Sequence, residues 1–388
     1  MATFAISADR FVLPGATAQG GYLQIQDGAF GTWTAERPEC EIVAYPGATV
    51  GPGLVDTHIH GFHNHATTDR DPASIDDSSI ALAQAGTTTW LPTTFTEAVD
   101  EIEASCAAIA AADEARGDDF MGARIGGIYL EGPFFSLKKV GAQNPKYLIE
   151  PSIEVFKRWQ EAAGGRIVKS ALAAEHAGAE AYCAALDEMG VTTCIGHSAA
   201  SYHEALAAVN AGATCFVHTY NGQSALHHRD PGCVGAAMTT NGTYAEIICD
   251  GRHVVPEAVK ALVDAKGWQH TVLITDCLGC GGMPEGEYMS GGLPVVMKGG
   301  LCYLLNEDGT TGGIAGSVLT LAEGVKNMVD WQIVTADQAI RMATEVPARS
   351  ARIDGACGFI KPGRAADLTI FNADMTLAAT YVGGKLVA

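Results

Sequence analysis

The chain has 388 residues, of which 47% are hydrophobic and 18% are charged, a balance typical of a globular protein with a large buried core. Its formal net charge of −20 argues against nucleic acid or an anionic membrane surface as a partner, because both would repel it at long range. We find no basic segment followed by an apolar core near the start, and no apolar stretch approaches the roughly eighteen residues of a membrane span. Eleven cysteines without regular spacing suit a reducing compartment, so we expect a cytoplasmic protein.

Both ends of the chain have the pattern of short strands. Residues 1–52 and 353–388 contain brief apolar runs separated by Gly, Pro, Asp and Asn, which are the residues that punctuate turns. We expect the two ends to pair into one small accessory β-sandwich. The intervening residues, 53–352, have a different pattern and are predicted to form the main domain.

In this main segment, short apolar runs alternate with alanine-rich helical runs. The expected strands are residues 53–60, 87–95, 124–132, 166–175, 191–197, 213–219, 244–251 and 271–277. The expected helices are residues 74–86, 101–115, 155–165, 179–190, 201–212, 256–267 and a segment from about 335. Ser201 with Glu204 forms the capping box that marks a helix start. The alternation predicts an α/β fold, a (β/α)8 TIM-type barrel whose strands are buried on both faces.

Titratable side chains occur repeatedly where the predicted strands end, which is where barrels of this kind place their active sites. His58 and His60 end the first strand, and because side chains alternate along a strand, both point to the same face, here the barrel lumen. The other candidates at strand ends are Glu131, His197, His218, His253 and Asp276. Imidazoles with a carboxylate suit zinc or another divalent transition metal, and a free carboxylate opposite could accept a proton from water.

Each candidate taken alone also has an ordinary structural explanation. A histidine at a strand end is commonly a packing residue, and an Asp after a strand is frequently a helix cap. Their joint occurrence at one end of several strands favours a metal site. Cys277 and Cys280 have CxxC spacing but lack the second pair of a zinc ribbon, so we interpret them as loop thiols. The glycine-rich segment 311–324 lacks the spacing of a nucleotide-binding loop and is expected to shape the pocket.

Several motifs, taken in order, resemble a known family. The signatures of the N-acetylglucosamine-6-phosphate deacetylases, in the amidohydrolase superfamily, are matched by "GPGLVDTHIHG", "YLEGPFFSLKKVGAQNPKYL", "IGHSAASYHEA", "GATCFVHTYN", "HHRDPGCVGAA", "EIICDGRHVVPEAV" and "LITDC". The resemblance covers essentially the whole chain. It implies hydrolysis of the acetamide of N-acetylglucosamine 6-phosphate to glucosamine 6-phosphate and acetate. It also implies one or two divalent ions per subunit, for which we expect zinc.

The resemblance implies roles for particular residues. Glu131, His197 and His218 would bind the main metal ion, and His58 and His60, with Glu131 shared, a second one. Asp276 would be the general base that activates water and later protonates the departing amine. The substrate-binding set would be Lys139, Gln143, Asn221, Gly222, Arg229 and His253. Arg229 and His253 in particular would come from the neighbouring subunit of a homodimer.

Some positions depart from the family pattern. Gln143 stands where members usually carry a histidine that contacts the substrate carbonyl, and glutamine can donate a hydrogen bond but cannot carry positive charge. Two divergent segments, "NGQSALHHRDPG" and "TDCLGCGG", border the expected sugar pocket, so N-acetylgalactosamine 6-phosphate or another N-acyl amino sugar is an alternative substrate. Lys169, a position that some amidohydrolases carbamylate, is interpreted as structural because Glu131 already fills the bridging role.

Two further alternatives remain open on the sequence. One is another amidohydrolase, such as an N-acyl-amino-acid deacylase or a cyclic-amide hydrolase, although Lys139 and Arg229 speak for a phosphorylated substrate. The other is a catalytically inactive barrel that serves as a binding scaffold. Relatives of that kind lose metal ligands, whereas all the candidates are present here.

Overall fold

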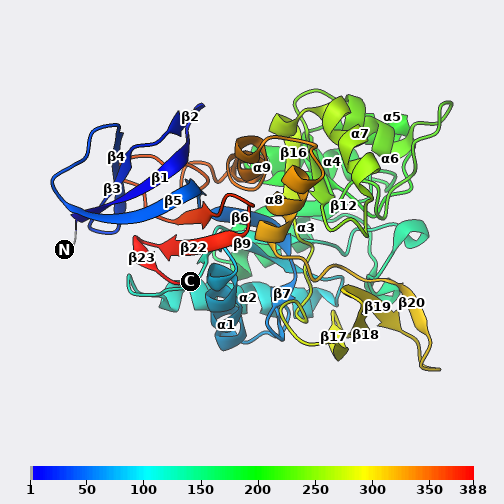
Figure 1. Cartoon of the computed structure of the whole chain (residues 1–388). Coiled ribbons are helices and arrows are strands. Elements are labelled where there is room, and N and C mark those ends of the chain that lie inside the picture. Colours follow the sequence, from blue (N-terminus) through cyan, green and yellow to red (C-terminus); the bar gives the residue numbers. More distant parts are fainter. Residues whose placement is uncertain (1–2) are drawn as a thin grey trace.

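The computed structural model describes residues 3–388 and shows a parallel barrel flanked by smaller sheets (Figure 1). The barrel strands are β6 (Leu54–Ile59), β9 (Thr87–Thr94), β11 (Ile128–Leu130), β12 (Ile167–Leu172), β13 (Thr192–Ile195), β14 (Ala213–Phe216), β15 (Tyr244–Ile248) and β16 (Thr271–Ile274). Each pairs in parallel with the next in this order. The Asp276 N–H donates to His58 O at 2.9 Å and the His60 N–H to Cys277 O at 2.8 Å, which joins the last strand to the first. The predicted (β/α)8 barrel is confirmed.

Helices surround the barrel and connect its strands. They are α1 (Pro72–Gln84), α2 (Val99–Ala115), α3 (Ile153–Ala162), α4 (Ala179–Glu188), α5 (Tyr202–Asn210), α6 (Gly232–Thr239), α7 (Pro256–Lys266), α8 (Leu321–Asp330), α9 (Ala336–Met342) and α10 (Glu345–Ser350). Short 3-10 helices cover Leu137–Lys139, Pro145–Tyr147 and Trp268–His270. The capping box of α5 is confirmed, since Glu204 Oε2 accepts from the Ser201 N–H at 2.7 Å. Helices α6 and α8 lie where the sequence pattern predicts none.

Both chain ends join in one accessory sheet, seen as blue and red strands beside the barrel in Figure 1. Its strands are β1 (Thr3–Leu13), β2 (Ala16–Gln19), β3 (Tyr22–Gln26), β4 (Ala29–Thr34), β5 (Glu41–Pro52), β21 (Leu368–Phe371), β22 (Leu377–Val382) and β23 (Lys385–Leu386). The two ends meet where β21 pairs antiparallel with β5, and residues such as Phe11, Val50 and Ile370 share one core. The expected accessory domain is confirmed as a single continuous eight-stranded sheet. Boundaries at residues 52 and 353 stay a prediction; β5 ends at Pro52 and α10 at Ser350.

A third sheet follows β16 and is not anticipated by the sequence pattern. It is antiparallel and consists of β17 (Gly286–Ser290), β18 (Leu293–Lys298), β19 (Leu301–Leu305) and β20 (Thr311–Ile314). Its inner residues, including Val295 and Met297, pack with Phe95 and Leu278 from the rim of the barrel. The sheet therefore forms one wall of the region above the strand ends.

The remaining strands are short. β7 (Gly61–Phe62) and β8 (His65–Ala66) form a hairpin after β6, and β10 (Arg124–Ile125) pairs with β9. All residues of β6 and β9 are buried, as expected for strands covered on both faces. Among residues 3–388, no helix combines the length and the apolar character needed to cross a bilayer.

Candidate active site and metal centre

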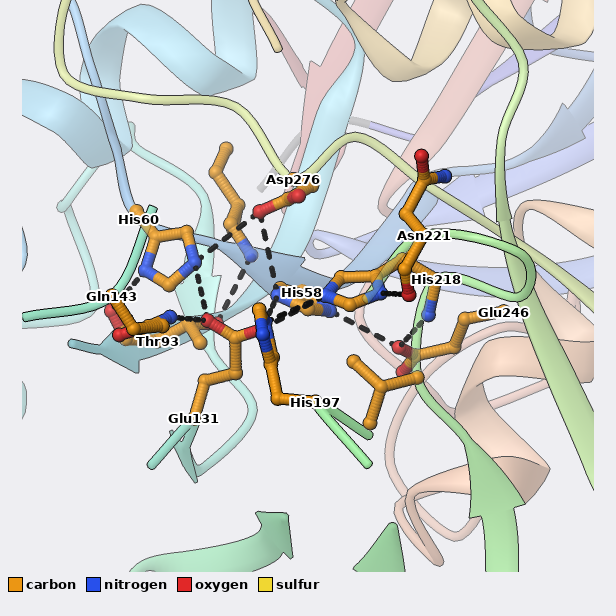
Figure 2. A network of polar contacts seen from close by, with 12 residues as sticks. His58, His60, Thr93, Glu131, Gln143, His197, His218, Asn221, Glu246 and Asp276 are labelled. Carbon is orange, nitrogen blue, oxygen red and sulfur yellow. Dashed lines mark hydrogen bonds and ion pairs between the residues drawn. The ribbon is translucent and has the colours of Figure 1, made fainter. Parts of the chain in front are cut away.

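Three candidate residues occupy the same position relative to a barrel strand. His197, His218 and Asp276 each lie two residues beyond the last residue of β13, β14 and β16, respectively. Each has a left-handed backbone, with φ values of 44°, 25° and 51°. This conformation is uncommon outside glycine and persists only where the surrounding structure imposes it, which happens mostly at functional sites. The repeated turn directs the three side chains toward one centre (Figure 2).

Glu131 lies at that centre, directly after β11, and its carboxylate faces two groups of imidazoles. In the first group, Glu131 Oε1 lies 3.2 Å from His197 Nε2 and 3.1 Å from His218 Nε2. The two Nε2 atoms are themselves 3.1 Å apart. All three side chains are buried, and their ligand atoms lie within 4.8 Å of one another.

The second group is formed by the end of β6. His60 Nε2 lies 3.1 Å from Glu131 Oε2, and His58 Nε2 lies 3.5 Å from Glu131 Oε1. Asp276 faces the same two rings, with Oδ1 3.2 Å from His60 Nε2 and 3.4 Å from His58 Nε2. The His60 ring stacks on Phe95 with a centroid separation of 4.0 Å. Glu131 is therefore shared between two groups of potential metal ligands, as the resemblance implies.

All four imidazoles contact a hydrogen-bond acceptor through Nδ1. The contacts are His58 with Glu246 Oε2 at 3.0 Å, His60 with Thr93 O at 3.2 Å, His197 with Lys139 O at 2.8 Å and His218 with Asn221 O at 3.0 Å. Carbonyl and carboxylate oxygens accept hydrogen bonds, so Nδ1 carries the proton of each neutral imidazole and Nε2 carries a lone pair. The four Nε2 lone pairs then face the carboxylates of Glu131 and Asp276. All of these groups carry negative charge or electron density, so they repel one another, and a cation bound between them would remove that repulsion.

Two further observations show that these residues fit a divalent ion. His58 Nε2 is buried and has no hydrogen-bond partner. Burial by itself lowers the pKa of His58, but the charges of Asp276 and Glu131 outweigh it and raise that pKa well above its ordinary value. The site thus attracts positive charge, and a nitrogen- and carboxylate-lined centre is the ligand set of zinc and related ions.

A cavity of about 200 Å³ opens above this centre. Its polar wall includes Gln143, Asn221, Gly222, His253 and Asp276, and its apolar wall includes Phe95, Leu278, Val295, Leu304 and Ile314. His253 is fixed by Asp250, whose Oδ2 lies 2.6 Å from His253 Nδ1. The expectation from the resemblance places His253 in the neighbouring subunit's site, whereas here it lines the cavity of its own chain. Segment 311–324 contributes Ile314, Ala315 and Gly316 to the wall, so it does shape the pocket.

Gln143 lies on the cavity wall but both ends of its amide have partners in the protein. Its Nε2 donates to Glu131 Oε2, and its Oε1 accepts from the Thr96 N–H at 2.8 Å. Gln143 therefore holds the Glu131 carboxylate in place. The sequence suggests only a contact with the substrate carbonyl.

Lys139 and Arg229 are the two substrate-binding candidates that the chain does not bring to this cavity. Within the described residues, neither is on the cavity wall. The Lys139 carbonyl orients His197, and Arg229 is exposed, with its guanidinium 2.7 Å from His228 Nε2.

Glu246, the partner of Lys169, is not anticipated from the sequence. Both are fully buried, on β15 and β12, and Glu246 contacts His58. A signal is present in the sequence, because each is a charged residue inside an otherwise apolar strand. Charges of opposite sign at such positions are expected only as a pair.

Comparison with known proteins agrees with this geometry. Residues 49–387 match the model of the amidohydrolase family. The chain belongs to the amidohydrolase family. This amidohydrolase is 38% identical to the N-acetylglucosamine-6-phosphate deacetylase of Vibrio furnissii, over 87% of this chain and 82% of that protein. It is 36% identical to the N-acetylgalactosamine-6-phosphate deacetylase of Escherichia coli O157:H7, over 87% of each chain.

A solved structure is similar along its whole length. The amidohydrolase superimposes with a TM-score of 0.92 on a mutant N-acetyl-D-glucosamine-6-phosphate deacetylase of Mycobacterium smegmatis in complex with N-acetyl-D-glucosamine-6-phosphate, at 27% identity and with 100% of both chains covered. The resemblance to this deacetylase family, recognised in the sequence motifs, is confirmed.

Proposed function

We propose that this amidohydrolase hydrolyses the acetamide of N-acetylglucosamine 6-phosphate, giving glucosamine 6-phosphate and acetate. The observation that carries the proposal is the convergence of Glu131, His197 and His218 below a cavity with Asp276 on its wall. The family and the named relatives support the same reaction. An inactive binding scaffold is disfavoured because all the ligand candidates are buried and mutually oriented.

The reaction requires a water molecule to attack the acetyl carbon and the C–N bond to break, with one proton delivered to the amine. A bound divalent ion polarises the carbonyl and lowers the pKa of the attacking water. Asp276 Oδ1 lies 3.2 Å from His60 Nε2 and 3.4 Å from His58 Nε2, so a cation bound at these nitrogens would favour the ionised form of Asp276. Asp276 is therefore a carboxylate that can accept the proton of the water and return it to the leaving nitrogen.

Binding of the sugar is assigned to the cavity wall. Asn221, Gly222 and His253 offer polar groups to the sugar hydroxyls, and the apolar wall contacts the ring face. Because the Gln143 amide is occupied by Glu131 and Thr96, carbonyl polarisation falls mainly to the metal site. Phosphate binding is assigned to Lys139 and Arg229; a planar guanidinium can hold two phosphate oxygens at once.

Three finer features complete the proposal. Zinc is the proposed ion, at one or two positions per chain, because imidazole and carboxylate ligands suit it. A homodimer is proposed because Arg229 is exposed and lies off its own chain's cavity, so that a second copy could supply it. The cytoplasm is the proposed compartment, and the free thiols of all eleven cysteines support it.

N-acetylgalactosamine 6-phosphate is a second candidate substrate. Identities of 38% and 36% to deacetylases of the two epimers are too close to choose between them. Initial rates of acetate release should be compared for both 6-phosphates and for unphosphorylated N-acetylglucosamine. The proposal expects the highest kcat/KM with N-acetylglucosamine 6-phosphate; equal values with and without phosphate would remove the phosphate assignment. No acetate from any of the three would refute the reaction.

A further inference from the structure

A buried ion pair between Glu246 and Lys169 lies on the Nδ1 side of His58, whereas the Nε2 atom of His58 faces Glu131 and Asp276. Figure 2 shows Glu246 beside His58. Glu246 of β15 accepts a hydrogen bond through Oε1 from the Lys169 ammonium of β12, and both side chains are fully buried. Its other oxygen, Oε2, lies 3.0 Å from His58 Nδ1 and 3.4 Å from the backbone nitrogen of His218. Three donors, two on strands β6 and β12 and one just after β14, therefore converge on one carboxylate.

The contacts of Glu246 are those of an ionised carboxylate. Its oxygens face the Lys169 ammonium, the His58 ring N–H and the His218 backbone N–H, and all three are donors. An ionised carboxylate only accepts hydrogen bonds, so the His58 proton must be on Nδ1. The His58 Nε2 lone pair is then directed into the metal centre, where it has no hydrogen-bond partner.

His58 differs from the other three imidazoles in this respect. His60, His197 and His218 place Nδ1 against backbone carbonyls, whereas His58 places it against a carboxylate. A carboxylate behind a ligating histidine fixes its tautomer and its ring orientation and makes it a stronger ligand. Burying an ion pair costs free energy of desolvation, so this arrangement needs a compensating role.

We propose that Glu246 is a positioning residue, held by Lys169, that fixes the tautomer and orientation of His58 and thereby sets the metal affinity of the His58–His60 position. This inference rests on the proposed metal-dependent function. Lys169 is the counter-ion of Glu246. Its ammonium also lies 4.6 Å from the centre of the Tyr129 ring. Both contacts are those of a positively charged ammonium, and a carbamylated lysine, which carries a negative charge, would face the Glu246 carboxylate unfavourably.

Glu246→Gln tests the proposal with little change of shape. A glutamine amide has one acceptor and one donor end, while the contacts of Glu246 are all donors, so an N–H must face another donor. We expect the metal content to fall from two ions per chain to about one, with an affinity loss at the His58–His60 position of roughly 10–100-fold. Glu257→Gln, at an exposed position in the first turn of α7, is the matched control and should retain both ions.

Two more variants keep the test decisive. Glu246→Asp retains the carboxylate and should recover part of the affinity. The double variant Lys169→Met with Glu246→Leu leaves no buried charge and no acceptor behind His58. It should therefore fold even where Glu246→Gln does not, and it should still lose the His58–His60 ion.

Metal content is measured by mass spectrometry of dialysed protein, and affinity by titration with Co²⁺, whose visible absorption reports the ligand set. Neither measurement needs substrate, so a protein that binds two ions but lacks deacetylase activity would contradict the proposed reaction and leave this inference intact. The role of Glu246 would be refuted if Glu246→Gln bound two ions with unchanged affinity. It would also be refuted if the wild-type protein bound only one ion.

Discussion

Asp276→Asn separates the proposed general base from the metal ligands. The replacement keeps the side-chain size, and asparagine tolerates the left-handed backbone at this position better than most residues. The two backbone hydrogen bonds of Asp276, to His58 O at 2.9 Å and from the Ser317 N–H at 2.7 Å, need no change. What is lost is a carboxylate oxygen that can accept a proton.

The size of the effect follows from that loss. General base catalysis contributes roughly 10²–10⁴-fold to a rate. At about 1.4 kcal/mol for each factor of ten, the barrier should rise by about 3–5.5 kcal/mol. Because Glu131, His197 and His218 form a ligand group without Asp276, the main metal ion should be retained. We therefore expect kcat to fall 10²–10⁴-fold with little change in KM.

The assay is acetate release under saturating N-acetylglucosamine 6-phosphate, together with metal analysis of the same preparation. Asp264→Asn is the control, because Asp264 lies on the exposed face of α7 and pairs only with Lys260 among its charged neighbours. A decrease of less than tenfold in the Asp276 variant, with metal retained, would show that another group takes the proton.

Three other predictions concern the fold and the metal. Gly132→Ala should lower the melting temperature and the metal content, because φ is +101° there and a Cβ would lie 2.1 Å from Thr96 Oγ1. The control Gly165→Ala, where φ is +81° and a Cβ would enter open space, should lower the melting temperature less. Equal decreases in the two variants would refute the steric argument. Removing metal with a chelator should lower the melting temperature, and added zinc should restore it; an unchanged melting temperature would contradict a metal bound in the folded state. Burial lowers the pKa of Lys266 from 10.5 to about 8, so the unfolded chain binds an extra proton between these values and the free energy of unfolding should rise with pH there. Urea unfolding of Lys266→Gln should lack this rise, and a parallel pH dependence in both proteins would refute it.

The sequence predicts the barrel and most of the metal site for the same physical reason. Strands buried on both faces give continuous apolar runs, and their ends are recognisable because a polar residue follows each run, as with Glu131 after β11 and His218 after β14. Parallel strands in a closed barrel bring those ends to one rim. The convergence of the candidate ligands is therefore a consequence of the barrel topology and can be predicted from the sequence.

Other features depend on contacts that strand periodicity does not encode. The pairing of Lys169 with Glu246 joins β12 to β15 across the barrel interior, and nothing in the linear pattern specifies which buried charges meet. The amide of Gln143 turns toward Glu131 and Thr96 because of a loop conformation. The sheet formed by β17–β20 has short, partly exposed strands with weak alternation, which resemble a glycine-rich loop in the sequence.

The most direct test of the central claim is an anomalous difference map of crystals grown with zinc, measured on both sides of the zinc absorption edge. We predict a peak within about 2.0–2.2 Å of a Glu131 oxygen and of His197 Nε2 and His218 Nε2. The absence of a peak between these three side chains, in crystals that contain zinc elsewhere, would contradict the metal-dependent mechanism.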